Sequence, residues 1–229
     1  MMYDDRQIFC FLRIIFAKIS RLWSNYTKNL MQADLLEKIR SFHGHMCPGL
    51  AMGIRAAEIA LEEIGAHSAD EEVVALVETD MCGVDAIQFM TGCTFGKGNL
   101  IHRDYGKNVY TFFRRSDGKA IRVLTKPGAW GDPNDEHRQL FAKVRAGIAT
   151  PEEKSRFQQL HVAKSNVILD TPREQLFAFT EINAEPPKKA RIHSSIDCQE
   201  CGESAMETRI RKFGGRDLCI PCFENIETR

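Results

Sequence analysis

Apolar residues recur at helical spacing in the first part of the chain that has a clear pattern. Between residues 33 and 42 they share one helical face, at Leu35, Leu36, Ile39 and Phe42. After a glycine-rich break the same spacing returns over residues 50–64, and Gly65 follows. Intervals of three and four residues are typical of amphipathic helices, and glycine commonly ends one. We therefore predict helices over residues 33–42 and 50–64.

Short β-rich runs alternate with turn sequences in the middle of the chain. Residues 73–79 are rich in valine and predict a buried strand, and residues 84–91 predict a brief helix. Residues 108–115 and 120–124 predict the strands of a hairpin, because Ser116–Lys119 between them contains Asp-Gly, a frequent turn sequence.

The pattern after the hairpin predicts helices over residues 135–147 and 151–162 and strands over residues 166–169 and 177–182. Pro151, with acidic residues directly after it, is typical of a helix start. Helices and strands follow one another in mixed order, and a hairpin is present. We therefore predict an α+β core domain with a mixed or antiparallel sheet and flanking helices.

Residues 1–30 differ from the rest of the chain. Apolar residues alternate there with basic ones, among them Arg6, Arg13, Lys18 and Arg21. A basic amphipathic helix of this kind could lie on a membrane surface or on a partner protein. The alternative is that Met31 is the true start. We favour this interpretation, because a self-sufficient domain begins there.

Composition and charge narrow the class of protein. Apolar residues make up 43% and charged residues 27% of the chain, which suffices to bury a core and excludes wholesale disorder. The 31 basic and 31 acidic residues balance, so no overall positive field attracts nucleic acid. No apolar run approaches the roughly 20 residues that a membrane-spanning helix needs. We expect a cytoplasmic protein without a transmembrane segment.

Four cysteines near the C-terminus predict a zinc finger. They are Cys198, Cys201, Cys219 and Cys222, in the pattern C-x2-C-x17-C-x2-C. Each two-residue gap lets one tight turn present two thiolates to the same ion, and two such turns complete a tetrahedron. Disulfides or a redox pair are the alternatives, which the lack of a secretory signal disfavours. Four thiolates leave no open position, so we expect this Zn²⁺ to be structural.

These patterns predict the domain organisation. Residues 1–30 form an N-terminal extension and residues 31–184 the core domain. Residues 185–195 form a linker that begins with Glu-Pro-Pro-Lys-Lys, and residues 196–229 form the small zinc-finger domain.

A second group of chemically active residues lies in the core domain: His43, His45, Cys47, Cys82 and Cys93. The cysteines stand at the ends of predicted elements, and glycines surround them. Cys47 and Cys82 precede predicted helices, where the positive end of the helix dipole should lower the pKa of a thiol. The alternative is that each is a small buried or structural residue. The glycine-rich surroundings favour a functional group.

Three segments of the core resemble one known family. They are His43–Gly49 (HGHMCPG), Cys82–Gln88 (CGVDAIQ) and Thr91–Leu100 (TGCTFGKGNL), which match in order. Residues 33–182 resemble the E-subunit family of formylmethanofuran dehydrogenase, and the four-cysteine segment resembles the treble-clef finger that some members carry. The resemblance implies an α+β core, a homodimer, and clustering of these Cys and His residues at an active or metal site. It also implies a link to a molybdenum or tungsten enzyme of one-carbon metabolism.

The chemistry of the core group leaves alternatives open. Thiolates and imidazoles suit Zn²⁺ or another transition metal, so we expect a second metal there, able to act as a Lewis acid or to activate water. Without metal, Cys47 beside His45 could act as a nucleophile or redox thiol. Asp85 either balances a helix dipole or supports a ligand histidine. Lys97 either binds an anionic cofactor in its glycine loop or is a solvated lysine.

Three functions follow from these residues. The first is an enzyme or accessory subunit in one-carbon redox metabolism, an oxidoreductase subunit among the choices. The second is a metal-dependent carrier or assembly factor for a molybdenum or tungsten enzyme. The third is a nucleic-acid-binding regulator, which basic residues in and before the finger would serve: Lys188, Lys189, Arg191, Arg209, Arg211, Lys212 and Arg216. We disfavour the third, because no aromatic residues interleave them for stacking.

Overall fold

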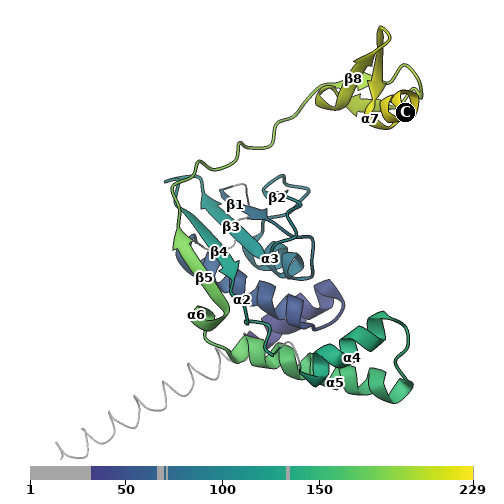
Figure 1. Cartoon of the computed structure of the whole chain (residues 1–229). Coiled ribbons are helices and arrows are strands. Elements are labelled where there is room, and N and C mark those ends of the chain that lie inside the picture. Colours follow the sequence, from purple (N-terminus) through teal and green to yellow (C-terminus); the bar gives the residue numbers. More distant parts are fainter. Residues whose placement is uncertain (1–31, 66–69, 71, 133–134, 229) are drawn as a thin grey trace, which may run out of the picture. The chain divides into compact units, whose positions relative to one another are not determined.

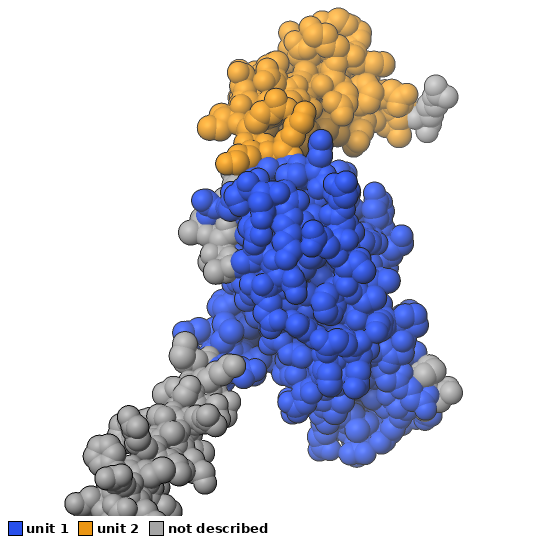
Figure 2. Space-filling model, turned by 90° about the vertical axis from the view of Figure 1, so that its left-hand side faces the viewer, with its two compact units in different colours: residues 1–187 blue, residues 188–229 orange. Residues whose placement is uncertain are grey.

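The computed structural model describes residues 32–65, 70, 72–132 and 135–228. The contacts within the chain divide it into two compact units, residues 1–187 and residues 188–229 (Figure 2). The amphipathic pattern of residues 1–30 lies outside the described residues. Each unit is considered by itself below.

A mixed sheet forms the framework of the first unit. Its strands are β1 (Val73–Val77), β2 (Leu100–His102), β3 (Val109–Arg114), β4 (Ala120–Thr125) and β5 (Phe177–Glu181). Their order in space is β2-β1-β3-β4-β5. β1 and β2 run parallel, and the other neighbours are antiparallel. The predicted α+β class with a mixed sheet is thus confirmed. β2 was not predicted, since three residues between glycine-rich and charged segments carry no strand pattern.

Helices make up the rest of the first unit. Residues 32–43 are helical, and α2 (Pro48–Glu63), α3 (Gly83–Thr91), α4 (Glu136–Arg145), α5 (Pro151–Asp170) and α6 (Arg173–Leu176) follow. α4 and α5 form a helical hairpin beside the sheet layer (Figure 1). No helix among the described residues combines the length and apolarity needed to cross a bilayer.

The predicted strand over residues 166–169 is wrong, because α5 continues through it to Asp170. A capping box at Thr150 and Glu153 starts this helix. Ser165 and Ile168 are buried three residues apart, on one helical face. A short apolar run cannot be assigned from periodicity alone, and here it belongs to a helix that packs on α2.

Alternate strand residues divide the core between the two faces of the sheet. Ala75, Phe112 and Val123 join the large cluster that α2 and α3 build on one face. Val74 and Phe113 point to the other face, into a smaller cluster. This period of two is what a sheet covered on both sides requires.

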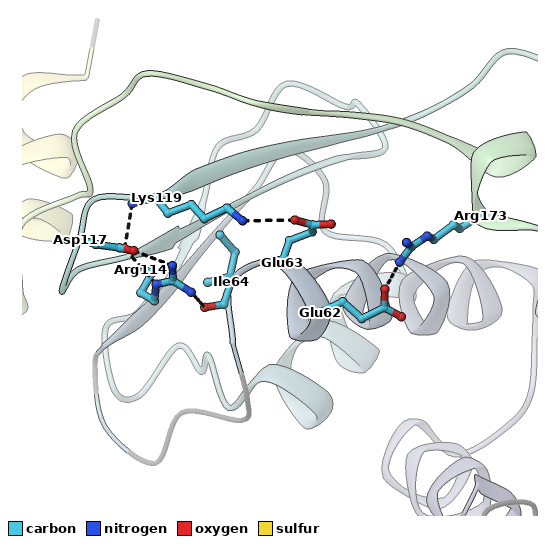
Figure 3. Close-up of polar contacts among 7 residues, drawn as sticks. All are labelled: Glu62, Glu63, Ile64, Arg114, Asp117, Lys119 and Arg173. Carbon is cyan, nitrogen blue, oxygen red and sulfur yellow. Dashed lines mark hydrogen bonds and ion pairs between the residues drawn. The ribbon is translucent and has the colours of Figure 1, made fainter.

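Side chains from the β3–β4 hairpin hold the C-terminal end of α2 (Figure 3). The Arg114 guanidinium donates to the carbonyl of Ile64 at 2.5 Å, and Lys119 Nζ lies 3.2 Å from Glu63 Oε2. Cations are favourable at a helix C-terminus, where carbonyls lack partners. These contacts fix α2 relative to the sheet and therefore fix its N-terminal end, where Cys47 lies.

The second unit is a small finger. It contains β6 (Ser195–Asp197), β7 (Ser204–Met206), a short 3₁₀ turn, β8 (Ile210–Phe213), β9 (Arg216–Cys219) and α7 (Ile220–Glu227). The predicted turn at Gly214 and Gly215 joins β8 to β9, and both glycines have positive φ, as a tight hairpin turn needs.

Candidate metal centre and its cleft

The starts of α2 and α3 bring the cysteines of the core into position. Cys47 is the N-cap of α2, and its Sγ accepts a hydrogen bond from the Leu50 amide at 3.3 Å. Cys82 occupies the equivalent place before α3. Each cysteine thus presents its sulfur at a helix start.

Glycines let the two helices approach closely enough for the sulfurs to meet. A Cβ on Gly53 of α2 would overlap the backbone of Gly83 in α3. A Cβ on Gly49 would lie 3.2 Å from Cys82 Cβ and 3.8 Å from the sulfur of either cysteine. The glycine-rich pattern seen in the sequence therefore has a packing reason at this contact.

His43, Cys47 and Cys82 form one group, with a ligand atom of each within 4.8 Å of the others. Cys47 Sγ lies 3.9 Å from Nε2 of His43, while Nδ1 of His43 lies 2.6 Å from the Asp85 carboxylate. A carboxylate that holds one ring nitrogen and leaves the other for a metal is a common arrangement. Two sulfurs and one imidazole fit Zn²⁺ or another transition metal of similar softness, with a coordination position left open.

Burial changes the properties of Cys47 from those expected. The sequence predicts a lowered pKa because of the helix start. In the structure Cys47 is buried, and this burial raises the pKa of its thiol to about 11. The amide bond from Leu50 lowers the pKa but does not outweigh the loss of solvation. A free nucleophilic thiolate at Cys47 is therefore disfavoured, whereas a ligand thiol that loses its proton to a metal is not affected by this argument.

His45 lies beside this group without belonging to it. The rings of His43 and His45 are 4.6 Å apart between centroids, at 35° to each other. His45 lines a cleft of about 390 Å³ that also contains Cys47 and Cys82. It is therefore placed to meet a molecule in the cleft.

Cys93 and Lys97 lie away from the group. Cys93 follows Gly92, whose positive φ ends α3, and its side chain is fully buried against the Val73 carbonyl at 3.4 Å from Sγ. Burial raises the pKa of the Cys93 thiol. The nearby charge of Lys97 acts on Cys93, and neither residue lines the cleft. The structure supports the interpretation of Cys93 as a small buried residue.

The opposite wall of the cleft carries residues that the sequence analysis missed. His137 and Arg138 come from α4, and His161 and Lys164 come from α5. Nε2 of His137 lies 2.8 Å from Nδ1 of His161. On isolated predicted helices each histidine looks like an ordinary polar residue. Only the packing of the α4–α5 hairpin brings them together, and no local pattern announces it.

Tyr110 closes the floor of the cleft from β3. Its hydroxyl lies where a Cβ on Gly83 would come within 2.5 Å, so Gly83 leaves room for it. Burial and the neighbouring Cys82 sulfur raise the pKa of Tyr110, which keeps the phenol neutral.

The second unit brings its own cysteines together. Sulfur atoms of Cys198, Cys201, Cys219 and Cys222 all lie within 4.8 Å of one another. Cys201 Sγ and Cys219 Sγ are 3.9 Å apart, close to the about 3.8 Å edge of a tetrahedron with Zn–S bonds near 2.3 Å. Backbone amides that bond the sulfur lower the pKa of Cys198 to about 6. This set fits a closed, structural Zn²⁺ site.

The basic residues of the finger are partly paired with acids. Arg216 forms an ion pair with Glu200, and Lys212 Nζ lies 3.4 Å from Asp217 Oδ1. This pairing reduces the positive field that binding to a phosphate backbone would use. It favours the interpretation of these side chains as a solvated face.

Comparison with known families matches both units. Residues 42–178 match the family described as "FmdE, Molybdenum formylmethanofuran dehydrogenase operon". Residues 193–227 match the prokaryotic dksA/traR C4-type zinc finger.

Comparison with individual proteins gives a similar picture. A curated protein of Archaeoglobus fulgidus, described as a probable S-adenosyl-L-methionine-binding protein, is 34% identical over 197 residues. The match covers 82% of this chain but only 52% of that protein, so the chain spans about half the length of its relative. A crystal structure of an FmdE-like protein of tungsten formylmethanofuran dehydrogenase from Syntrophus aciditrophicus has the same fold, with a TM-score of 0.56 at 23% identity. That match covers 86% of this chain and 94% of the other.

Proposed function

Since the chain belongs to the FmdE family and ends in a C4-type zinc finger, we propose that its core holds a second transition metal through His43, Cys47 and Cys82. Zn²⁺ in the finger is structural, and the metal of the core faces the cleft. When bound there, such a metal supplies Lewis-acid chemistry. The chain's own residues orient it: Asp85 holds the His43 ring, and Tyr110 and His45 offer polar groups to a bound molecule.

One observation carries this proposal. Ligand atoms from the segment before α2 and from the start of α3 converge within 4.8 Å, beside a cleft of about 390 Å³. Structural thiolate sites are closed, whereas sites that act on small molecules keep a position open to them. The finger has the first character and the core has the second.

We further propose that this centre serves molybdenum- or tungsten-linked one-carbon redox metabolism, as an accessory or catalytic component that works as a cytoplasmic homodimer. The description of the family supports this role. The alternative is a carrier or assembly factor that delivers the core metal to a molybdenum or tungsten enzyme. A catalytic component keeps its metal through turnover, whereas a carrier releases it to the metal-free partner enzyme, so metal exchange with that enzyme distinguishes them.

The curated relative suggests S-adenosyl-L-methionine as a further ligand to consider. Its sulfonium group is a cation. None of the described residues that line the cleft is an aspartate or glutamate, while Arg138 and Lys164 line it. This lining disfavours S-adenosyl-L-methionine as the ligand of this cleft, and equilibrium dialysis with the labelled compound tests the point.

The experiment that tests the proposed centre is a metal count. We expect two metal ions per chain in protein purified without added metal, measured by elemental analysis. Cys47→Ser should leave one, in the finger. Cys93→Ala is the matched control, because Cys93 is an equally buried cysteine outside the group, and it should keep two. If Cys47→Ser retains both ions, or wild type carries only the ion of the finger, the proposed core centre is wrong.

A further inference from the structure

The wall that α4 and α5 place opposite the metal centre has an unusual charge. Arg138 and Lys164 line the cleft together with His137 and His161. No acidic side chain belongs to the lining among the described residues. Two sulfurs and a dication balance at the proposed centre, so the charge of the cleft is set by this wall.

The two histidines of the wall form a fixed pair. Their rings are 5.1 Å apart between centroids and only 16° from parallel, with Nε2 of His137 2.8 Å from Nδ1 of His161. A centroid separation this much longer than the N–N distance means that the rings meet edge to edge, nearly in one plane. That geometry suits an N–H···N hydrogen bond, which one shared proton satisfies. Phe157 packs on His137 at 5.1 Å and on His161 at 4.8 Å.

The pair remains neutral in an environment of positive charge. Burial, and then the neighbouring His137, His45 and Lys164, lower the pKa of His161 to about 4. Burial and Lys164 also lower the pKa of His137, against the effect of Asp135. Asp135 bonds Lys164 Nζ at 3.0 Å and is the acid that faces the pair. Arg138 on α4 adds a further cation.

We propose that the cleft takes an anionic ligand, a carboxylate or another oxyanion, which Arg138, Lys164 and His161 hold opposite the Cys/His centre. This inference rests on the proposed function, in that it assigns a substrate class to the same cleft. A neutral imidazole donates an N–H to an oxyanion, while the cations balance its charge. The starts of α2 and α3, which reach the cleft through Pro48 and Gly83, add favourable dipoles.

Binding of formate and of inorganic phosphate to the zinc-loaded full chain tests this assignment. We expect at least one of them to bind by calorimetry, and ¹⁵N NMR of the histidines should show the pKa of His161 rising when it does. By linkage the affinity should increase as the pH falls toward that pKa. Tighter formate binding indicates a planar carboxylate, and tighter phosphate binding indicates a tetrahedral oxyanion. Tetramethylammonium, a cation of similar size, should not bind.

Variants of α4 show whether the wall is responsible. Arg138→Gln should weaken the binding about tenfold, as loss of a charged hydrogen bond does. Arg145→Gln is the matched control, because Arg145 is an exposed arginine on the same helix that does not line the cleft, and it should bind like wild type. His161→Gln should weaken the binding and remove its pH dependence.

Three results would overturn the assignment: neither anion binds below on the order of 10 mM, tetramethylammonium binds better, or Arg145→Gln weakens binding as much as Arg138→Gln. The metal count of Cys47→Ser keeps this outcome separate from the proposed function. If that variant retains both metals while Arg138→Gln loses the anion, the centre is wrong and the anion site stands. If the metal count is as expected and no anion binds, only the anion site is wrong.

Discussion

The Asp85 carboxylate lies 2.6 Å from Nδ1 of His43, and this contact decides which ring nitrogen remains for the centre. Without Asp85 the ring could rotate or carry its proton on Nε2. We expect Asp85→Ala to weaken the core metal by about 10- to 100-fold, measured by competition with a chromophoric chelator. Asp80→Ala is the control, since Asp80 is an exposed acid just before the same helix. Equal metal affinity in Asp85→Ala and wild type would contradict this role.

Close packing of α2 on α3 gives a second prediction. Because a Cβ on Gly53 would overlap the backbone of Gly83, we expect Gly53→Ala to lower the free energy of unfolding by about 1–3 kcal/mol. The same change should move Cys47 away from Cys82 and weaken the core metal. Urea denaturation and the metal count measure the two effects.

Gly96→Ala is the control for this substitution. Nothing lies within 4 Å of a Cβ at Gly96, and its φ is not positive. The control should therefore leave both stability and metal affinity unchanged. A stable Gly53→Ala protein with full metal content would show that the helices can separate without cost.

The sequence located the centre because its chemistry is local. Cys47 and Cys82 both precede helices, and glycines mark the close contact between these helices. Cys93 has similar surroundings, yet the turn at Gly92 directs it into the core. The direction of one side chain after a turn depends on tertiary packing that a sequence pattern does not contain.

The opposite wall could not be predicted for a different reason. His137 and His161 are 24 residues apart, and each lies on a helix whose polar residues show no special spacing. They meet only because α4 folds back on α5. The fold class, the hairpin and the finger could be predicted, since periodicity and turn sequences specify them locally, whereas β2 and the end of α5 depended on neighbours in space.

The finger should depend on its metal far more than the first unit does. Among the described residues, its buried apolar cluster consists of Cys198, Leu218 and Cys219, too little to offset the entropy of ordering the chain. We expect a strong chelator to collapse the NMR signals of residues 196–227 to unfolded positions. The signals of the sheet strands should persist, because the cluster around Phe112 needs no metal. Unchanged finger signals after complete metal removal would contradict this prediction.

Acid should destabilise the first unit through His161. The pKa of His161 is about 4 in the folded chain against an ordinary value of 6.5, so between these values the unfolded state binds more protons. Stability is then complete above about pH 6.5 and is lost as the pH falls toward 4. We expect wild type to lose on the order of 1 kcal/mol more than His161→Gln between pH 7 and pH 4.5, after allowance for partial exposure.

Urea denaturation at the two pH values measures this difference. Asp117 and Asp135 have lowered pKa values, so their contributions are lost only at more acidic pH. Glu58, whose pKa burial raises, acts in the opposite direction but equally in both proteins. The comparison with His161→Gln therefore isolates the imidazole, and His102→Gln on β2, an exposed histidine, should behave like wild type. Equal acid sensitivity of His161→Gln and wild type would show that the pair stays solvated, because only a desolvated imidazole near Lys164 resists protonation.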